Sequence, residues 1–509
     1  MGIRVNLAAG VLHSFWGAAL AIAVVPFYLR YLGIEAYGLI GFFTAMQAIL
    51  AFLDMGMGPT TMREVARFMG RGSLAPARDL VRTLAVIYWS IAALIAVSVW
   101  LLAPWIAEGW LKGQTLTADV LSSAVMLMGV IIAIRFPISL YGGALAGAHR
   151  LALVSTIGIV AVTLANVGAV VVLAFVSPTI EAFFVWQALA AVLYVIAMQV
   201  AAWRVLGEAR SARFDVGQLK RVWRFSASMA GAATIGAIFM QSDKVVLSSI
   251  VSLEDFGRYS LAAVIARSLY LFTTPAFNVA YPRLTTLLAT GDETEARVFY
   301  KTGTRMMMAV VFSAAAFVTV FSREIFLLWT GEVALGDETV AVVGLLLLGT
   351  AINGIMHFPY AAQLAAGKSH LPLIINAGLL VVFVPMLLYL ASNYGLSGAA
   401  GAWALLNFFY LIVGTYLTHR VIFRGIAVGW LAGDVGIPFL TSLLFVAIGG
   451  TLVQATEWGG FARLAAGAGL AGLAVLATVL VSPGLIAETR HLTAFLSRKT
   501  QPQPRGPEG

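Results

Sequence analysis

The sequence contains no cysteine and few charged residues. Of its 509 residues, 11% are charged and 61% are hydrophobic. The absence of cysteine excludes disulfides, thiolate metal sites and cysteine nucleophiles. A soluble domain carries about a quarter charged residues and somewhat under half apolar ones, so a soluble enzyme is excluded as well. The composition indicates a polytopic membrane protein.

Sequence motifs for metals and nucleotides are also missing. The six histidines are scattered, and none has the HExxH spacing or another spacing typical of metal ligands. No Gly-rich loop of the Walker type occurs, and no soluble stretch has the size of an ATPase domain. We therefore expect no metal or other cofactor, no catalytic residue and no ATP-driven pump.

Apolar runs long enough to cross a bilayer recur along nearly the whole chain. A membrane helix needs about 20 mostly apolar residues, and fourteen runs meet this requirement. The predicted spans are 7–29, 36–58, 82–103, 120–143, 151–176, 181–203, 226–250, 257–280, 303–323, 338–360, 371–391, 396–418, 431–453 and 462–483. The division of residues 226–280 into two spans decides the orientation of every span that follows.

The basic residues alternate with the predicted spans. The chain has 32 Lys and Arg against 23 Asp and Glu, a net charge of +9. With a cytoplasmic N-terminus, the outer loops hold only Arg30, Lys112, Arg258, Arg323 and Arg463, while nearly all other basic residues lie in inner loops. This asymmetry follows the positive-inside rule and predicts that both termini are cytoplasmic. The membrane topology thus explains the net positive charge, and we expect no nucleic-acid partner.

Short segments recur at a nearly constant offset. The matching pairs are Gly33-Ile-Glu-Ala-Tyr-Gly38 with Ser252-Leu-Glu-Asp-Phe-Gly257, Leu145-Ala-Gly-Ala-His-Arg-Leu151 with Ala365-Ala-Gly-Lys-Ser-His-Leu371, and Phe136-Pro137 with Phe358-Pro359. The members of each pair are separated by six predicted spans, and an even number of spans preserves orientation. We therefore predict two parallel six-helix repeats related by an axis along the membrane normal, which gives a pseudo-two-fold arrangement.

The repeat divides the chain into five predicted parts. They are an N-terminal six-helix bundle (1–205), a cytoplasmic linker (206–225), a second six-helix bundle (226–420), two additional transmembrane helices (421–487) and a cytoplasmic tail (488–509). The tail is too rich in Pro and Gly to fold. Two facing bundles are typical of alternating-access carriers, whose substrate site lies near the midplane. A scaffold or channel is the alternative.

Several ionisable side chains lie within predicted spans, where a charge costs about 2.5 kcal/mol or more. They are Asp54, Arg135, Asp243, Lys244 and Arg267. Asp243 and Arg267 lie at similar depth on neighbouring predicted helices, so one interpretation is a structural ion pair between them. Asp54 is expected to pair with Arg63 or to cap a neighbouring helix.

Arg135 has no acidic residue at comparable depth in its own half of the sequence. At 1.5 Å rise per residue it lies about 18 Å from Gly147 at the inner end of its span, near mid-membrane. A guanidinium matches a phosphate with paired donors, so we predict that Arg135 contacts the substrate. Amide side chains also fall within spans, where they suit hydroxyl-rich ligands or bridge helices. They are Gln47, Asn166, Gln187, Gln199, Gln241, Asn278, Asn353, Asn376 and Asn407.

Several segments resemble those of bacterial polysaccharide flippases of the Wzx type. They are Tyr31-Leu-Gly-Ile-Glu-Ala-Tyr-Gly38, Leu53-Asp-Met-Gly-Met-Gly58 with the following Arg63-Glu-Val-Ala-Arg67, and Tyr141-Gly-Gly-Ala-Leu-Ala-Gly-Ala-His-Arg150. That family belongs to the MOP exporter superfamily, whose fold is shared by MATE drug exporters and the lipid II flippase. The resemblance implies the same all-α fold here. MATE exporters generally have twelve spans, so the two additional helices favour the flippase branches.

The resemblance also implies a function. Such proteins move undecaprenyl-pyrophosphate-linked oligosaccharides from the inner to the outer leaflet of the bacterial inner membrane, for O-antigen or exopolysaccharide synthesis. In the lipid II flippase the last two helices form a groove for the lipid tail, which implies the same role here. We expect a cavity between the two halves to accept the head group, with Arg135 and Arg267, and also Lys244 and Arg30, binding its phosphates. Expected partners are the lipid-linked oligosaccharide, membrane lipids, a polysaccharide polymerase and a chain-length regulator.

Two alternatives remain open at the level of sequence. A MATE-type, ion-coupled exporter of small molecules would hold its coupling cation at Asp54 or Asp243. A membrane scaffold of a polysaccharide assembly machine would flip no lipid and would co-purify with a polymerase.

Overall fold

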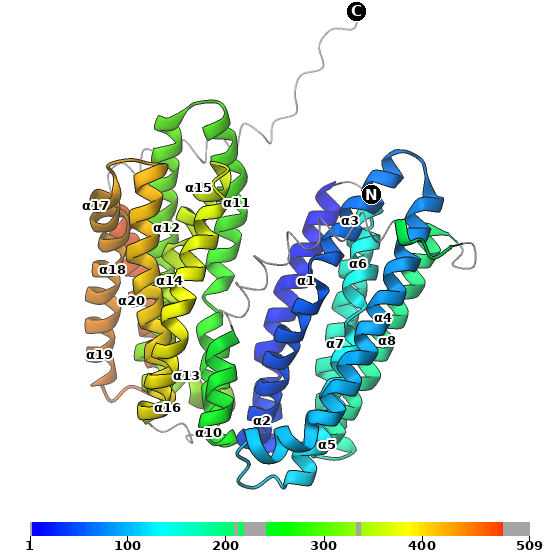
Figure 1. The fold of residues 1–509 in the computed structure, drawn as a ribbon. Helices are drawn as coiled ribbons and strands as arrows, with labels where there is room; N and C mark the ends of the chain where they lie inside the picture. The colour runs from blue at the N-terminus through cyan, green and yellow to red at the C-terminus, as the bar shows by residue number, and fades with distance from the viewer. Residues whose placement is uncertain (1–2, 208–211, 218–240, 332–336, 482–509) are drawn as a thin grey trace, which may run out of the picture. The chain divides into compact units, whose positions relative to one another are not determined.

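The computed structural model describes residues 3–207, 212–217, 241–331 and 337–481, and all regular structure in these residues is helical (Figure 1). The chain divides into two compact units. The first comprises Met1–Val264, Trp329–Gly331 and Leu380–Ala399, and the second comprises Ile265–Leu328, Glu332–Leu379 and Ala400–Gly509. The predicted tail, much of the predicted linker and most of the predicted span 226–250 lie outside the described residues.

The first unit is built from long apolar helices. In chain order they are α1 (Ile3–Ala23), α2 (Val25–Leu50), η1 (Ala51–Asp54), α3 (Met57–Gly70), α4 (Leu74–Trp105), the π-helical η2 (Ile106–Trp110), α5 (Ala118–Arg135), α6 (Ile138–Gly147), α7 (Leu151–Phe175), α8 (Ile180–Leu206) and the start of α10 (Leu253–Arg267). Helix α7 packs on α1 and α8, and α5 packs on α4 and α8 (Figure 1).

The second unit surrounds one long helix, α12. Its helices are α11 (Tyr270–Ala289), α12 (Glu293–Val320), α13 (Ser322–Thr330), α14 (Asp337–Ile355), α15 (His357–Ala365), most of α16 (His370–Val421), α17 (Ala427–Gly429), the π-helical η4 (Trp430–Gly436), α18 (Ile437–Ser442), the π-helical η5 (Leu443–Ile448), α19 (Gly449–Gln454) and α20 (Gly460–Leu480). Helix α12 packs against α11, α14, α18 and α20.

Among the described residues, ten helices are long and apolar enough to cross a membrane, or up to eleven if the bent pair α10–α11 is one span. The chain is thus an all-helical polytopic membrane protein, as predicted. The predicted number of spans is larger for three reasons. Only the segment Leu12–Ala23 of α1 qualifies as apolar, and it is short. The span 226–250 is mostly undescribed, and α16 contains two predicted spans.

Glycines with a positive φ interrupt two of these long helices. Gly33 in α2 has φ 80° and ψ 174°, and Gly395 in α16 has φ 55° and ψ −132°. An L-residue with a Cβ is strained at such positive φ values, whereas glycine is not. Helix α16 has 52 residues, which corresponds to about 78 Å and exceeds twice the ~30 Å hydrocarbon core. Both glycines lie between predicted spans and allow the chain to turn there.

The two recurring segments around Gly38 and Gly257 pack directly against each other in the first unit. A Cβ on Gly38 would clash with the carbonyl oxygen of Leu253, and a Cβ on Gly257 would clash with that of Ile34. The backbone nitrogen of Gly257 lies 3.0 Å from the Cβ position of Gly38, and the reverse distance is 3.1 Å. Such a reciprocal contact is what a two-fold axis between α2 and α10 would produce.

Candidate functional site

A helix break places Arg135 at the centre of a long membrane segment. Helix α5 ends at Arg135 and α6 begins at Ile138, with Phe136 and Pro137 between them. Proline has no backbone N–H and cannot continue the helical hydrogen bonding of the preceding turn. A cation at a helix C-terminus is stabilised by the partial negative charge of the terminal carbonyls. Broken membrane helices often form the substrate sites of transporters.

The Arg135 guanidinium is held by neutral groups. Its Nη1 donates to Gln47 Oε1 of α2 at 3.1 Å, and its Nη2 donates to Gln187 Oε1 of α8 at 2.8 Å. Its Cζ lies 5.8 Å from the centre of the Phe43 ring. Gln187 in turn donates its amide to the carbonyl oxygen of Ala165 at 3.2 Å. Amide oxygens orient the guanidinium but do not neutralise it, and Arg135 forms no ion pair within the part of the chain that the structure describes.

Arg267 occupies a similar position in its own span. It is the last residue of α10, and the chain bends by 41° between α10 and α11. Its side chain is exposed. Arg30, the fourth predicted phosphate ligand, is also exposed, and its guanidinium lies 5.9 Å from the ring centre of Tyr31. Both mid-membrane arginines therefore end a helix at a break within a span.

Lys244 and Asp243 form a buried ion pair with each other. The Lys244 ammonium donates to both carboxylate oxygens of Asp243, at 2.9 and 2.8 Å. The Tyr259 hydroxyl also donates to Asp243, at 2.9 Å. Within the first unit Asp243 is thus paired with its neighbour in sequence, and its pairing with Arg267 stays a prediction. The positive charge of Lys244 is compensated by this carboxylate.

Asp54 caps a helix. Its Oδ2 accepts the backbone N–H of Gly58 in the first turn of α3 at 3.3 Å, and its Oδ1 accepts the hydroxyl of Tyr88. Of the two roles expected from the sequence, capping is the one that the structure has. Arg63 instead bonds Glu64 at 2.8 Å.

The second unit has a polar cluster of its own beside the matching helix break. Helix α14 ends at Ile355 and α15 begins at His357, directly before Phe358-Pro359. The Tyr270 hydroxyl donates to Asn353 Oδ1 at 3.4 Å, and Asn353 donates to Asn407 Oδ1 at 2.8 Å. Because the Phe-Pro pairs correspond in sequence, His357 is the counterpart of Arg135 in the predicted repeat.

Sequence reasoning missed an acidic residue at the beginning of the predicted span 431–453. Asp434 lies in η4 with its side chain 1% exposed, and its Oδ1 accepts Arg305 Nη2 of α12 at 2.6 Å. The Lys301 ammonium, one turn earlier on α12, lies 3.9 Å from Oδ2. The indole of Trp430 stacks on the Tyr300 ring at 5.6 Å. The signal was present, because an aspartate inside an apolar run needs a partner.

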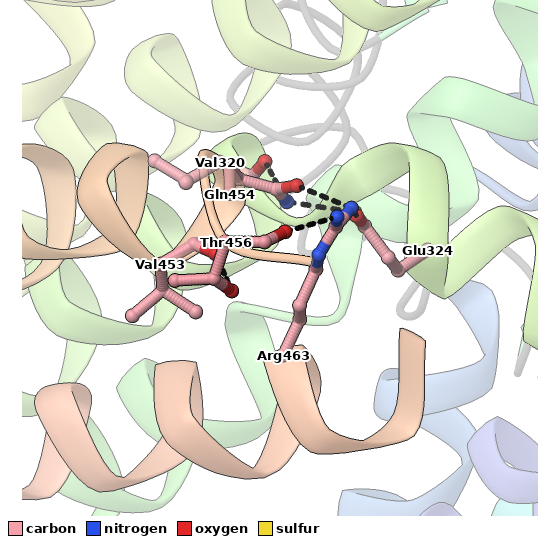
Figure 2. Close-up of polar contacts among 6 residues, drawn as sticks. All are labelled: Val320, Glu324, Val453, Gln454, Thr456 and Arg463. Carbon is pink, nitrogen blue, oxygen red and sulfur yellow. Dashed lines mark hydrogen bonds and ion pairs between the residues drawn. The ribbon is translucent and has the colours of Figure 1, made fainter. Parts of the chain in front are cut away.

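A second polar cluster joins α19 and α20 to the C-terminal end of α12 and to α13. Figure 2 shows the Arg463 guanidinium pointing toward Glu324, with Nη1 3.4 Å from Oε1, while its Nη2 donates to the carbonyl oxygen of Thr456 at 2.6 Å. The Gln454 amide donates to Glu324 Oε2 at 2.8 Å and to the carbonyl oxygen of Val320 at 3.3 Å. The hairpin of α19 and α20 is therefore fastened to the end of α12 and the start of α13 by charge-assisted hydrogen bonds.

Solved structures with the same fold are transporters. The lipid II flippase MurJ in an inward closed conformation matches 94% of this chain and 99% of its own length, with a TM-score of 0.74 and 12% identity. An inward-facing MATE family multidrug resistance transporter of the MOP superfamily matches 82% of this chain and 98% of its own length, with a TM-score of 0.67 and 13% identity. At these identities the likeness shows the fold. The chain therefore has the helical fold of this class of membrane transporter.

The sequence identifies the family within this class. The profile of the polysaccharide biosynthesis protein family matches residues 6–288, and the chain belongs to that family. A candidate O-antigen transporter of Shigella flexneri is 22% identical over 391 residues, which cover 76% of this chain and 90% of the relative. The predicted family is thus confirmed, and the protein is a multi-pass membrane protein of the polysaccharide biosynthesis protein family.

Proposed function

We propose that the protein flips undecaprenyl-pyrophosphate-linked oligosaccharides from the inner to the outer leaflet of the bacterial inner membrane by alternating access. The observation that carries the proposal is the position of Arg135, a cation at a mid-membrane helix break with amide partners only. Such a guanidinium retains donors for a phosphate oxygen. Membership of the polysaccharide biosynthesis family and the flippase fold support a lipid-linked glycan as the substrate.

The proposal includes a topology of fourteen spans with both termini in the cytoplasm. Two six-helix repeats form the carrier, and the last two spans form an addition to it. Helices in both repeats show the same packing, since α3 packs on α6 and α11 packs on α15. The basic residues of the alternate loops support the orientation through the positive-inside rule.

The polyprenyl chain remains in lipid beside the last two spans in this proposal. Large apolar side chains of α20 are exposed, among them Phe461, Leu476 and Leu480. In a soluble protein such exposure would be costly, but in a membrane these side chains are suited to contact with an acyl or prenyl chain. The Asp434 cluster joins η4 to α12, and the Arg463 cluster joins α19 and α20 to α13, so both attach the last helices to the rest of the second unit.

A cation-coupled exporter is less well supported. It needs a carboxylate that can bind a coupling ion, and the sequence offers Asp54 and Asp243 for this role. Both oxygens of Asp54 accept hydrogen bonds from Tyr88 and Gly58, and both oxygens of Asp243 accept hydrogen bonds from Lys244. These protein donors occupy the positions that a coupling ion would need.

Complementation of a flippase-null strain tests the arginine roles. Loss of one hydrogen bond to a charged group costs roughly 1.5–3 kcal/mol, so the Arg135→Ala, Arg267→Ala double variant is expected to lower polysaccharide export roughly 10-fold or more. Arg135→Lys should recover part of the export, since an ammonium keeps the charge without the paired donors. The control is Arg297→Ala, which removes a surface cation paired with Glu293. Wild-type export by the double variant would refute the phosphate-binding roles.

A further inference from the structure

Three aromatic rings of the second unit are stacked in a row. Phe277 of α11 lies between Tyr281 of α11, with centroids 6.0 Å apart and planes 8° apart, and Tyr360 of α15, at 5.4 Å and 18°. The His357 ring meets Phe277 edge-on, at 6.4 Å and 80°. We call Phe277, Tyr281, Tyr360 and His357 the ring platform.

The outer rings of the platform are open. Tyr281 is 38% exposed and Tyr360 is 36% exposed, whereas tyrosines such as Tyr88 and Tyr300 are fully buried in the helix packing. The buried rings of Tyr300 and Trp430 are also stacked, with planes 26° apart, but neither of them is exposed. The ring platform therefore combines parallel rings with accessible phenol groups.

The platform lies on a polar face of α11. Tyr270, Thr274, Phe277, Asn278 and Tyr281 recur at helical spacing and form one stripe. Both Thr274 and Asn278 are exposed. The exposed apolar residues Phe272 and Val279 lie on the opposite face of α11, whereas the exposed Leu271, seven residues before Asn278, borders the stripe.

Exposed polar side chains within a membrane span are costly against lipid, so Thr274 and Asn278 favour a surface that faces a ligand or water. The exposed Arg267 ends α10 three residues before Tyr270, near the N-terminal end of this stripe. The ring platform therefore lies beside exposed polar side chains of the second unit.

We propose that the ring platform binds a sugar ring of the transported glycan. This inference rests on the proposed function. The C–H groups on one face of a pyranose form an apolar patch that packs on an aromatic ring, while its hydroxyl groups need hydrogen-bonding partners. Sites for such ligands have mostly apolar and aromatic walls with a few polar groups that fix orientation. Here the phenol groups of Tyr281 and Tyr360 and the imidazole of His357 supply those groups.

The platform gives the second unit a recognition chemistry that differs from that of the first. At the matching helix break, the first repeat has the Arg135 guanidinium and the second has the His357 imidazole beside stacked rings. A permanent cation suits the pyrophosphate. An imidazole beside aromatic faces suits an uncharged, hydroxyl-bearing ring. Arg135-Phe136-Pro137 and His357-Phe358-Pro359 share the Phe-Pro pair that breaks the helix. They differ in the first residue, which in this proposal sets the kind of group that each binds.

The test measures binding of the free glycan. The probe is the oligosaccharide released by mild acid from the lipid-linked oligosaccharides of the wild-type strain. Saturation-transfer NMR on the purified full-length protein reports which sugar protons contact it, and titration gives the affinity. Aromatic contacts are worth about 0.5–1.5 kcal/mol each, so Tyr360→Leu and Tyr281→Leu should each weaken binding roughly 2- to 10-fold. Tyr360→Phe, which keeps the ring, should retain most of the affinity.

Phe272→Leu is the matched control, because Phe272 is 45% exposed on the apolar face of the same helix. Its affinity should equal that of the wild type. Both tyrosines are exposed, so their replacement should leave the melting temperature unchanged and loss of binding cannot be attributed to misfolding. Wild-type affinity in the two leucine variants would overturn the proposal. So would binding of tetraphenylphosphonium, but not of the oligosaccharide, at these rings, since that result would define a site for lipophilic cations.

Failure of the ring platform and failure of the proposed function give different results. If the null strain accumulates lipid-linked oligosaccharide and the leucine variants bind the glycan normally, the function stands and the platform is refuted. If the null strain accumulates none while the wild type binds the glycan through these rings, the platform stands and the flippase assignment is refuted.

Discussion

The backbones of Gly38 and Gly257 are in contact, and neither position has space for a Cβ atom. They occupy the same place in the two recurring segments, and Gly41 faces Ser260 in the same way one turn later. Small residues at a crossing let two membrane helices approach closely. The two segments that recur in the sequence are thus in physical contact in the first unit.

The glycine contact makes a prediction about stability. Gly38→Ala and Gly257→Ala should each lower the stability by about 1–3 kcal/mol, as overpacking does, although alanine is the better helix former. Gly378→Ala is the control, since a Cβ there has no atom within 4 Å and should be neutral or stabilising by about 0.5–1 kcal/mol. Melting temperatures of the purified proteins measure the difference. Equal stability of all three variants would contradict the close crossing.

The Asp434 cluster should behave as a buried ion pair. Asp434→Ala leaves the partly buried Arg305 without its carboxylate, which is expected to cost about 3–5 kcal/mol. The double variant Asp434→Ala, Arg305→Met should regain much of this loss, because it leaves no uncompensated charge. Thermal unfolding of the single and double variants tests the coupling. Additive losses would show that Arg305 and Asp434 do not act as a pair.

The Arg463 cluster should control local rather than global stability. Arg463→Ala removes the contacts to Glu324 and to the Thr456 carbonyl, so amide exchange in residues 449–463 is expected to accelerate. Exchange in α4, which belongs to the first unit, should be unchanged. The surface pair of Arg297 and Glu293 provides the comparison, since such pairs contribute only about 0–1 kcal/mol. If Arg463→Ala and Arg297→Ala have the same effect on exchange, the cluster in Figure 2 has no fastening role.

The absence of cysteine makes the proposed topology directly measurable. Single cysteines at Lys112 and Glu457 should react with a membrane-impermeant maleimide added to spheroplasts. Cysteines at Arg150 and Arg424 should react only after the membrane is opened. All four positions are exposed in the structure. Labelling of Arg424→Cys from outside would mean that the number of spans between Arg150 and Arg424 is odd, which contradicts the proposed topology.

Apolar run length and turn residues were sufficient to predict the helical architecture. Each apolar run is about as long as the hydrocarbon core is thick, so the chain has to turn between runs. The turns at Gly33 and Gly395 have a positive φ, which glycine adopts without strain. The Phe136-Pro137 and Phe358-Pro359 pairs each mark a helix break, since proline interrupts backbone hydrogen bonding. These features depend on local chemistry, and a single sequence contains that information.

The partners of the buried charges could not be predicted in the same way. The pairing of Asp243 with the adjacent Lys244 lies within one helical segment. Asp243 bonds Tyr259 of α10 because of how the two helices are rotated about their axes, and depth along the membrane normal does not determine that rotation. Arg135 contacts Gln47 and Gln187 for the same reason, although all three residues were candidates from the sequence. The ring platform was missed because it requires α11 and α15 to pack together, and no periodicity within either helix indicates that pairing.

The most direct test of the proposed function is lipid analysis after deletion of the gene. The account predicts that cells without the protein accumulate undecaprenyl-pyrophosphate-linked oligosaccharide in the inner leaflet, protected from an impermeant glycan-modifying reagent. Expression of the wild-type protein should clear this pool, and the Arg135→Ala, Arg267→Ala variant should not. A deletion strain with no accumulated lipid-linked oligosaccharide and normal surface polysaccharide would contradict the assignment of the protein as a flippase.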